Sequence, residues 1–194
     1  VGELAYQEAL PFRATVAGTR VRVRLDNDGE EGAAVTLTPA FGATERWVIV
    51  SDPSSSLVIL GVATVERERA ESGVDVQVFH ASADAGPVDV HFHQSLSPGV
   101  AELSNPVSTD LMFRSGSATL PDQPFQDYVV SLTEVGNTST SIVDFNTGLN
   151  TAGLASSGDA LAFIVTGSVA GGATNLDLVV VGADGQRGSP IGGQ

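Results

Sequence analysis

Apolar and polar residues alternate with a period of two along most of this chain, in short segments separated by turn residues. Such alternation is typical of β-strands with one face against a core and the other toward solvent. Helical periodicity is confined to residues 2–10 and 65–70, and 22 Gly and 9 Pro suit a protein with many tight turns. The pattern predicts an all-β fold, with strands at residues 21–25, 35–38, 47–50, 56–63, 74–79, 88–92, 128–132, 141–145, 161–166 and 176–181.

The order of these strands repeats along the chain. In each half a strand near a Pro-containing stretch precedes a strand with hydroxyl residues, an aromatic-bearing strand and an apolar strand. We therefore predict two tandem antiparallel β-sandwich domains that are copies of one fold. The predicted boundaries are a first copy at residues 1–65, a charged linker at 66–73, a complete second copy at 74–182 and a Gly-rich tail at 183–194.

The two predicted copies are unequal, because the first begins at a point equivalent to about residue 107 of the second. Its opening strands then have no counterpart, and unpaired strand edges are costly when buried and adhesive when exposed. Three explanations stay open. The missing strands belong to residues upstream of this sequence, a neighbouring subunit donates a strand, or the first copy is a shorter sandwich that needs none.

The segment 74–92 reads VDVQVFHASADAGPVDVHF. It resembles the opening signature V-x-V-x-H-x-S-x-D-A-x-x-V-D-V of the bacterial secreted domain of unknown function 4397. The resemblance implies an immunoglobulin-like β-sandwich in a secreted, extracellular or cell-surface protein of a bacterium. It implies no particular chemistry.

Four polar residues of this segment, His80, Ser82, Asp84 and Asp89, are the candidate site. Parity places His80 at the inner end of its strand, where Asp84 and the loop amides can accept its N–H. We expect the four to form a structural clasp that fixes the turn between two strands. A catalytic His–Asp pair with Ser82 is the disfavoured reading, because no G-x-S-x-G elbow accompanies it.

Two metal sites are weaker alternatives. His91 and His93 share one outer strand face with Asp89, a spacing that can chelate a transition metal, although we expect two exposed surface histidines. Asp26, Asp28 and Glu30 have calcium-loop spacing, but the loop lacks the required Gly at position six and Glu at position twelve. A hairpin turn with Gly29 at positive φ fits this loop better than a calcium site does. We predict no cofactor for the chain.

Charge and composition narrow the function further. The formal charge of −14 disfavours nucleic acid and anionic membrane surfaces as partners. The chain has no Cys, and its longest apolar run, residues 57–63, is too short for membrane insertion. We therefore expect a secreted or cell-surface, non-enzymatic structural or adhesive protein that self-associates through strand edges. Its expected form is an extracellular filament subunit that assembles by β-strand complementation. The alternative is an extracellular module that binds a glycan, a cell-surface partner or a divalent cation.

Overall fold

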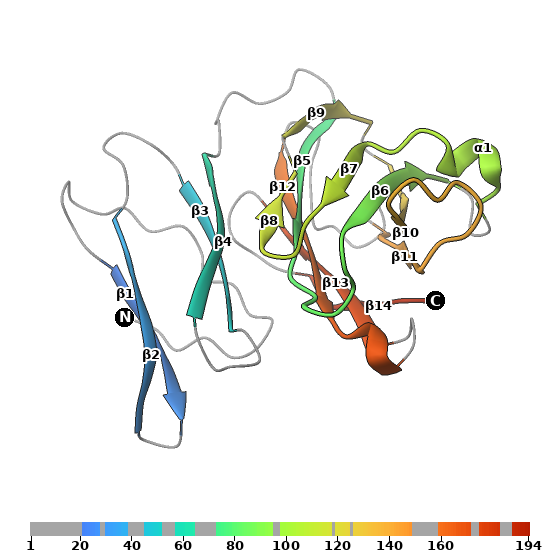
Figure 1. Cartoon of the computed structure of the whole chain (residues 1–194). Helices are drawn as coiled ribbons and strands as arrows, with labels where there is room; N and C mark the ends of the chain where they lie inside the picture. The colour runs from blue at the N-terminus through green and yellow to red at the C-terminus, as the bar shows by residue number, and fades with distance from the viewer. Residues whose placement is uncertain are drawn as a thin grey trace.

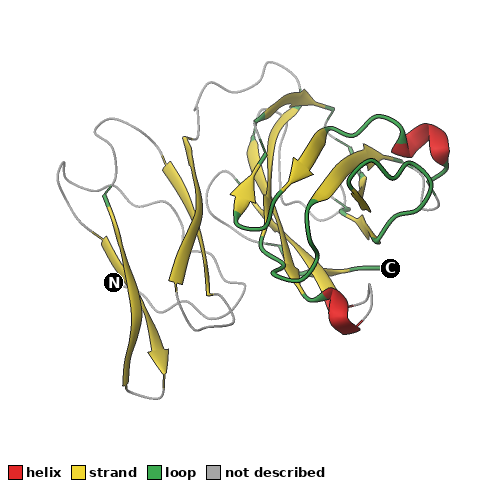
Figure 2. Ribbon diagram, viewed as in Figure 1, coloured by secondary structure: helices red, strands yellow, loops and turns green. Residues whose placement is uncertain are grey.

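The computed structural model describes residues 21–27, 30–38, 45–51, 57–64, 73–94, 98–117, 119–124, 126–148, 159–171, 175–182 and 188–194. These residues are mostly strands, which confirms the predicted all-β fold (Figures 1 and 2). The strands are β1 (Val21–Asn27), β2 (Glu30–Leu37), β3 (Glu45–Ser51), β4 (Leu57–Thr64), β5 (Val74–His80), β6 (Val88–His93), β7 (Ser108–Leu111), β8 (Ser115–Gly116), β9 (Leu120–Gln123), β10 (Val129–Glu134), β11 (Val143–Asn146), β12 (Ala160–Gly167), β13 (Leu176–Val181) and β14 (Ile191–Gly192).

Residues 73–194 build two sheets. One has the strand order β11-β10-β6-β7, and all of its pairs are antiparallel. The other has the order β14-β13-β12-β5-β8, with β9 also paired to β5. Within it β5 and β12 are parallel, and the remaining pairs are antiparallel. Both strands expected in the segment 74–92 are therefore present, as β5 and β6, but they lie in different sheets.

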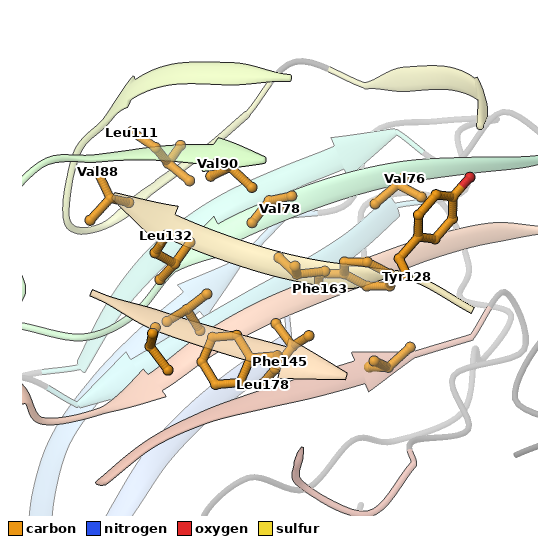
Figure 3. Packing of buried hydrophobic residues seen from close by; sticks show 14 of the residues in the cluster. Val76, Val78, Val88, Val90, Leu111, Tyr128, Leu132, Phe145, Phe163 and Leu178 are labelled. Carbon is orange, nitrogen blue, oxygen red and sulfur yellow. The ribbon is translucent and has the colours of Figure 1, made fainter. Parts of the chain in front are cut away.

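The two sheets enclose one apolar core (Figure 3). Each strand contributes every second residue, as the alternating sequence predicts for a half-buried strand. Burying one large aliphatic or aromatic side chain stabilises a fold by about 1.5–3 kcal/mol, so this core is the main source of stability. Its largest members include Phe145 and Phe163, and Phe92 packs against it while partly buried. The core-facing positions are Val74, Val76, Val78, Val88, Val90, Leu111, Tyr128, Val130, Leu132, Val143, Phe145, Leu161, Phe163, Val165, Leu176, Leu178 and Val180.

The described residues before residue 73 form two separate two-stranded sheets, β1–β2 and β3–β4. Asp26 faces Glu31 and Asn27 faces Glu30 across the first pair, which confirms the predicted antiparallel hairpin. Residues 28 and 29, and with them the proposed role of Gly29, lie outside the described residues. So do the two stretches of helical periodicity, 2–10 and 65–70. In space β4 lies against β5 and β8 (Figure 1).

Short elements escaped the sequence analysis. The strands β7, β8, β9 and β14 are two to four residues long, too short for an alternation to be read. Between β6 and β7 the chain forms the one-turn helix α1 (Val100–Leu103), and a 3₁₀ turn, η1 (Val169–Gly171), follows β12. The strand β10 also ends two residues later than predicted, at Glu134.

We predict that Gly167→Ala destabilises the protein. Gly167 ends β12 with φ of +94°, and an added Cβ would lie 2.1 Å from the carbonyl oxygen of Asn175. Backbone strain of this kind costs about 1–3 kcal/mol, so the free energy of unfolding in urea should fall by at least that amount. In the control Gly192→Ala the new methyl meets no atom within 4 Å, and the change should stay within about 0.5 kcal/mol. Equal stability of the two variants would contradict the prediction.

Candidate functional site

The loop between β5 and β6 satisfies both ring nitrogens of His80, which is 0% exposed. The Nε2 atom lies 2.7 Å from the carbonyl oxygen of Gly86, and the backbone N–H of Ser82 donates to Nδ1 over 3.3 Å. A carbonyl can only accept, so the ring is the neutral tautomer with the proton on Nε2. Burial lowers the pKa of His80, and the bond to Gly86 opposes that effect. The acceptor of its N–H is thus Gly86 and not Asp84, the acceptor expected from the sequence.

Asp84 instead connects this loop to the segment that follows β12, at the same end of the second sheet. Its carboxylate accepts from the Ser168 hydroxyl at 2.5 Å and from the amides of Val169 and Ala170, each at 3.1 Å. Those groups are the start of η1, so Asp84 caps this turn from a loop 84 residues earlier in the chain. The Ser82 hydroxyl also donates to Asp84, over 3.2 Å. The Ser168 bond is the main cause that lowers the pKa of Asp84 to about 2.

Asp89 does not contact the other three candidate residues and bonds to other parts of the chain. It lies on β6 with 5% of its surface exposed, and its two oxygens accept from the backbone amides of Asp110 and Gly136, both at 2.8 Å. Both donors have positive φ, 52° for Asp110 and 76° for Gly136. Asp89 therefore connects β6 to β7, where Asp110 lies, and to the turn after β10 that contains Gly136. The structure brings together His80, Ser82 and Asp84, which we name the loop clasp, and it places Asp89 outside it.

The loop clasp lacks the geometry of a nucleophile and its base. The Ser82 hydroxyl donates to Asp84, and His80 uses both of its nitrogens on backbone groups. A serine nucleophile needs a base within hydrogen-bond reach of its hydroxyl proton. The other bonds of His80 and Asp84 reach groups of the same loop and of the segment after β12, so the clasp joins these two segments.

His91 and His93 are buried, with 1% and 8% of their surfaces exposed, and the expectation of two exposed histidines is wrong. Parity was correct: both lie on the face of β6 that points away from the core. This face is covered, because the connection between β6 and β7 carries α1, which contacts β6 (Figure 1). The helix residue Leu103 is itself 1% exposed. Alternation alone does not reveal such a cover.

A polar network surrounds the two histidines. The Nε2 atom of His91 lies 3.1 Å from Thr133 Oγ1, and that of His93 lies 2.6 Å from Ser131 Oγ. Ser131 gives its only hydroxyl proton to the Asp144 carboxylate. His93 must therefore be the donor to Ser131, which places a proton on its Nε2 atom.

The Nδ1 atoms of both histidines are buried and have no hydrogen-bond partner within the described part of the chain. An unsatisfied buried polar atom costs about 1–3 kcal/mol. Burial lowers the pKa of His91, His93 reinforces this effect, and Asp89 opposes it. The ring nitrogens of neutral imidazole are metal ligands, yet the described residues contain no group of three or more acidic or histidine side chains that could hold a metal ion. Asp28 of the other candidate, the calcium-like loop, lies outside the described residues.

Sequence reasoning missed the partners that define both networks. Ser131 and Thr133 alternate with core residues on β10, and the register places Ser131 opposite His91 and Thr133 opposite Asp89. The sequence signal was the shared alternation of polar residues on two strands, which becomes a contact only when the pairing is known. No comparable signal links Ser168 with Asp84.

In comparisons with known proteins, no family model, curated protein or solved structure matches the chain. Among the described residues, no helix has the length and apolar character needed to cross a bilayer.

We predict that stability falls as the pH drops below about 6.5. The folded-state pKa values of His80 and His91 lie below the ordinary histidine value of 6.5, so in this range the unfolded chain binds more protons. The stabilising effect of keeping these rings neutral is complete above that pH and is lost progressively below it. Urea unfolding at about pH 7.5, 6.5 and 5.5 measures the trend. His91→Gln keeps a donor for Thr133 and should reduce the slope, whereas a pH-independent wild type would contradict the prediction.

A second prediction concerns Asp84→Asn. An amide cannot accept at both positions, so the variant should melt at a lower temperature at neutral pH. Because the pKa of Asp84 is lowered from 3.8 to about 2, its stabilising effect exists above pH 3.8 and disappears as the pH falls through 2. The stability difference between wild type and variant should therefore shrink over that window. The control is Asp110→Asn, since Asp110 uses its backbone amide in the bond to Asp89. A difference that persists at pH 2 counts against the role of the carboxylate.

Proposed function

We propose that this chain is a secreted or cell-surface, non-enzymatic structural or adhesive protein of a bacterium, and that its copies associate by β-strand complementation. The observation that carries the proposal is the state of the described strands before residue 73. They form two separate two-stranded sheets, whereas the later strands belong to sheets of four or more strands. Two-stranded sheets are marginally stable by themselves in water.

The order of hairpins supports two tandem immunoglobulin-like copies. In the second half β10 pairs with β11 and β12 pairs with β13, as β1 pairs with β2 and β3 with β4 in the first. The second half adds β6 beside β10 and β5 beside β12. By this correspondence β1 would accept an antiparallel strand like β6, and β3 would accept a parallel strand like β5. The resemblance of residues 74–92 to the secreted domain of unknown function 4397 agrees with this assignment.

Open strand edges explain why such a protein would bind its own kind. An edge presents a row of unpaired N–H and C=O groups, and an incoming strand satisfies them with main-chain hydrogen bonds. The formal charge of −14 opposes non-specific clustering of identical chains. Association then depends on directional strand pairing, which is what an ordered assembly requires. The loop clasp contributes by fixing backbone and supplies no reaction.

We predict that the purified chain grows in mass with concentration. Light scattering after size exclusion should show species larger than the monomer in the tens of micromolar range, and negative-stain microscopy should show linear particles. A peptide with the sequence of β5, VDVQVFH, should reduce the growth by occupying the edge of β3. A scrambled peptide of the same composition is the control. A monomer at every concentration would sink the proposal, and calcium or polysaccharide binding by such a monomer would favour a ligand-binding module instead.

A further inference from the structure

The sheet that contains β5, β12 and β13 has a second apolar surface on the face opposite the core. We name it the outer patch, formed by Phe79, Ala162, Ile164, Val179 and Val181, with Ala81 beside it. Phe79 and Ala162 are 0% exposed, Val179 is 3% and Val181 is 6% exposed. These residues alternate with core residues on the same strands, so their side chains leave the sheet on the other side. The three strands are thus buried on both faces.

The strand register makes the patch continuous. Ile164 pairs with Phe79 on one side and with Val179 on the other, and Ala162 pairs with Val181 in the next row. Polar residues end the patch in both directions: Thr166 faces Asp177, and Asp75 faces Ala160. An apolar centre with a polar border is the anatomy of a binding interface. Soluble chains rarely leave such a surface open to water.

Among the described elements, the β3–β4 hairpin contacts the sheet that carries the outer patch. β4 contacts both β5 and β8 (Figure 1). Gly116 of β8 lies directly against the Phe79 ring, since a Cβ built there would be 2.9 Å from Cε1. The sequence of β4 is LVILGVAT, which has a single polar residue, so this hairpin needs apolar cover on both of its faces. The outer patch supplies one such cover.

For the second half, charge favours contact with a first half over contact with another second half. Residues 1–73 have 7 Arg and 11 acidic residues, a net charge of −4, while residues 74–194 have 2 Arg and 12 acidic residues, a net charge of −10. Two copies of the second half repel each other most strongly. A first half, which carries most of the arginines, is the least repelled partner for a second half.

We infer that the outer patch is the docking surface for the β3–β4 hairpin, and that the hairpin of a second copy of this chain can take the place of its own. Eight residues, 65–72, separate β4 from Gly73 and span at most about 28 Å when extended. Short connections of this kind permit exchange of an element between identical chains, because each contact in the exchanged form already exists in the single chain. The exchange rests on the self-association proposed above, and the docking does not.

Docking is tested with a specific protease site inserted between residues 68 and 69 of the full chain. After cleavage the two pieces should still co-elute from size exclusion at micromolar concentration. Ile164→Lys places a charge at the centre of the patch without touching the core, so its pieces should separate, with affinity weakened at least about tenfold. Asn146→Lys, at an exposed position of β11, adds the same charge and should leave the pieces together. Should Ile164→Lys misfold, Val179→Ser gives a milder test of the same row.

Exchange is tested on the uncut chains by light scattering over a concentration series. Ile164→Lys should abolish growth in mass, and Asn146→Lys should retain it. Separation of the cleaved wild-type pieces would overturn the docking. Growth that continues unchanged in Ile164→Lys would overturn the exchange but leave the proposed self-association intact. A wild type that never grows would overturn self-association and exchange together, while co-elution of its cleaved pieces would still support docking.

Discussion

The parallel pairing of β5 with β12 is the contact on which the rest of the described structure depends. It joins strands separated by more than 80 residues, and backbone bonds extend it at both ends, from Asp75 to Asp159 and from Ala81 to Val165. Parallel pairs cannot be closed by a tight turn, so the geometry must be maintained by other contacts. The loop clasp provides one of them: directly after β5, Asp84 binds the first residues after β12. The polar residues of the 74–92 segment thus stabilise the register of a long-range strand pair.

The two polar networks differ in how completely they are satisfied. In the loop clasp each ring nitrogen of His80 has a hydrogen-bond partner, and these bonds offset the free-energy cost of burying the ring. On the outer face of the other sheet, His91 and His93 each leave one buried nitrogen without a described partner. Burial lowers the pKa of His80 in the first network and of His91 in the second, yet only the second retains unused hydrogen-bonding capacity. Acid sensitivity therefore reflects burial in the first case, and burial together with repulsion between neighbouring rings in the second.

Much of the fold follows from alternation, because a two-residue period determines which side chains share a face. It predicted the inward positions Val76, Val78 and Val90 and the hairpin between β1 and β2. It could not predict that β5 and β6, adjacent in sequence, enter different sheets, since pairing partners depend on contacts far along the chain. It also could not separate a solvated outer face from a covered one. This is why His91 and His93 were assigned to the surface, and why the role of Ser168 had no signal.

The outer face of the sheet that contains β12 and β13 is covered, as is the face of β6 that carries the two histidines. A two-layer protein whose outer faces meet water would alternate cleanly, yet β12 reads ALAFIVTG and β13 reads LDLVVV, nearly continuous apolar runs. Runs of this kind belong to strands with material on both sides. The energetic need to cover the outer patch is the same whether the cover comes from the same chain or another, so concentration decides between them. The outer patch and the β3–β4 hairpin both need apolar cover. Contact between the two halves supplies it, either within one chain or between neighbouring chains.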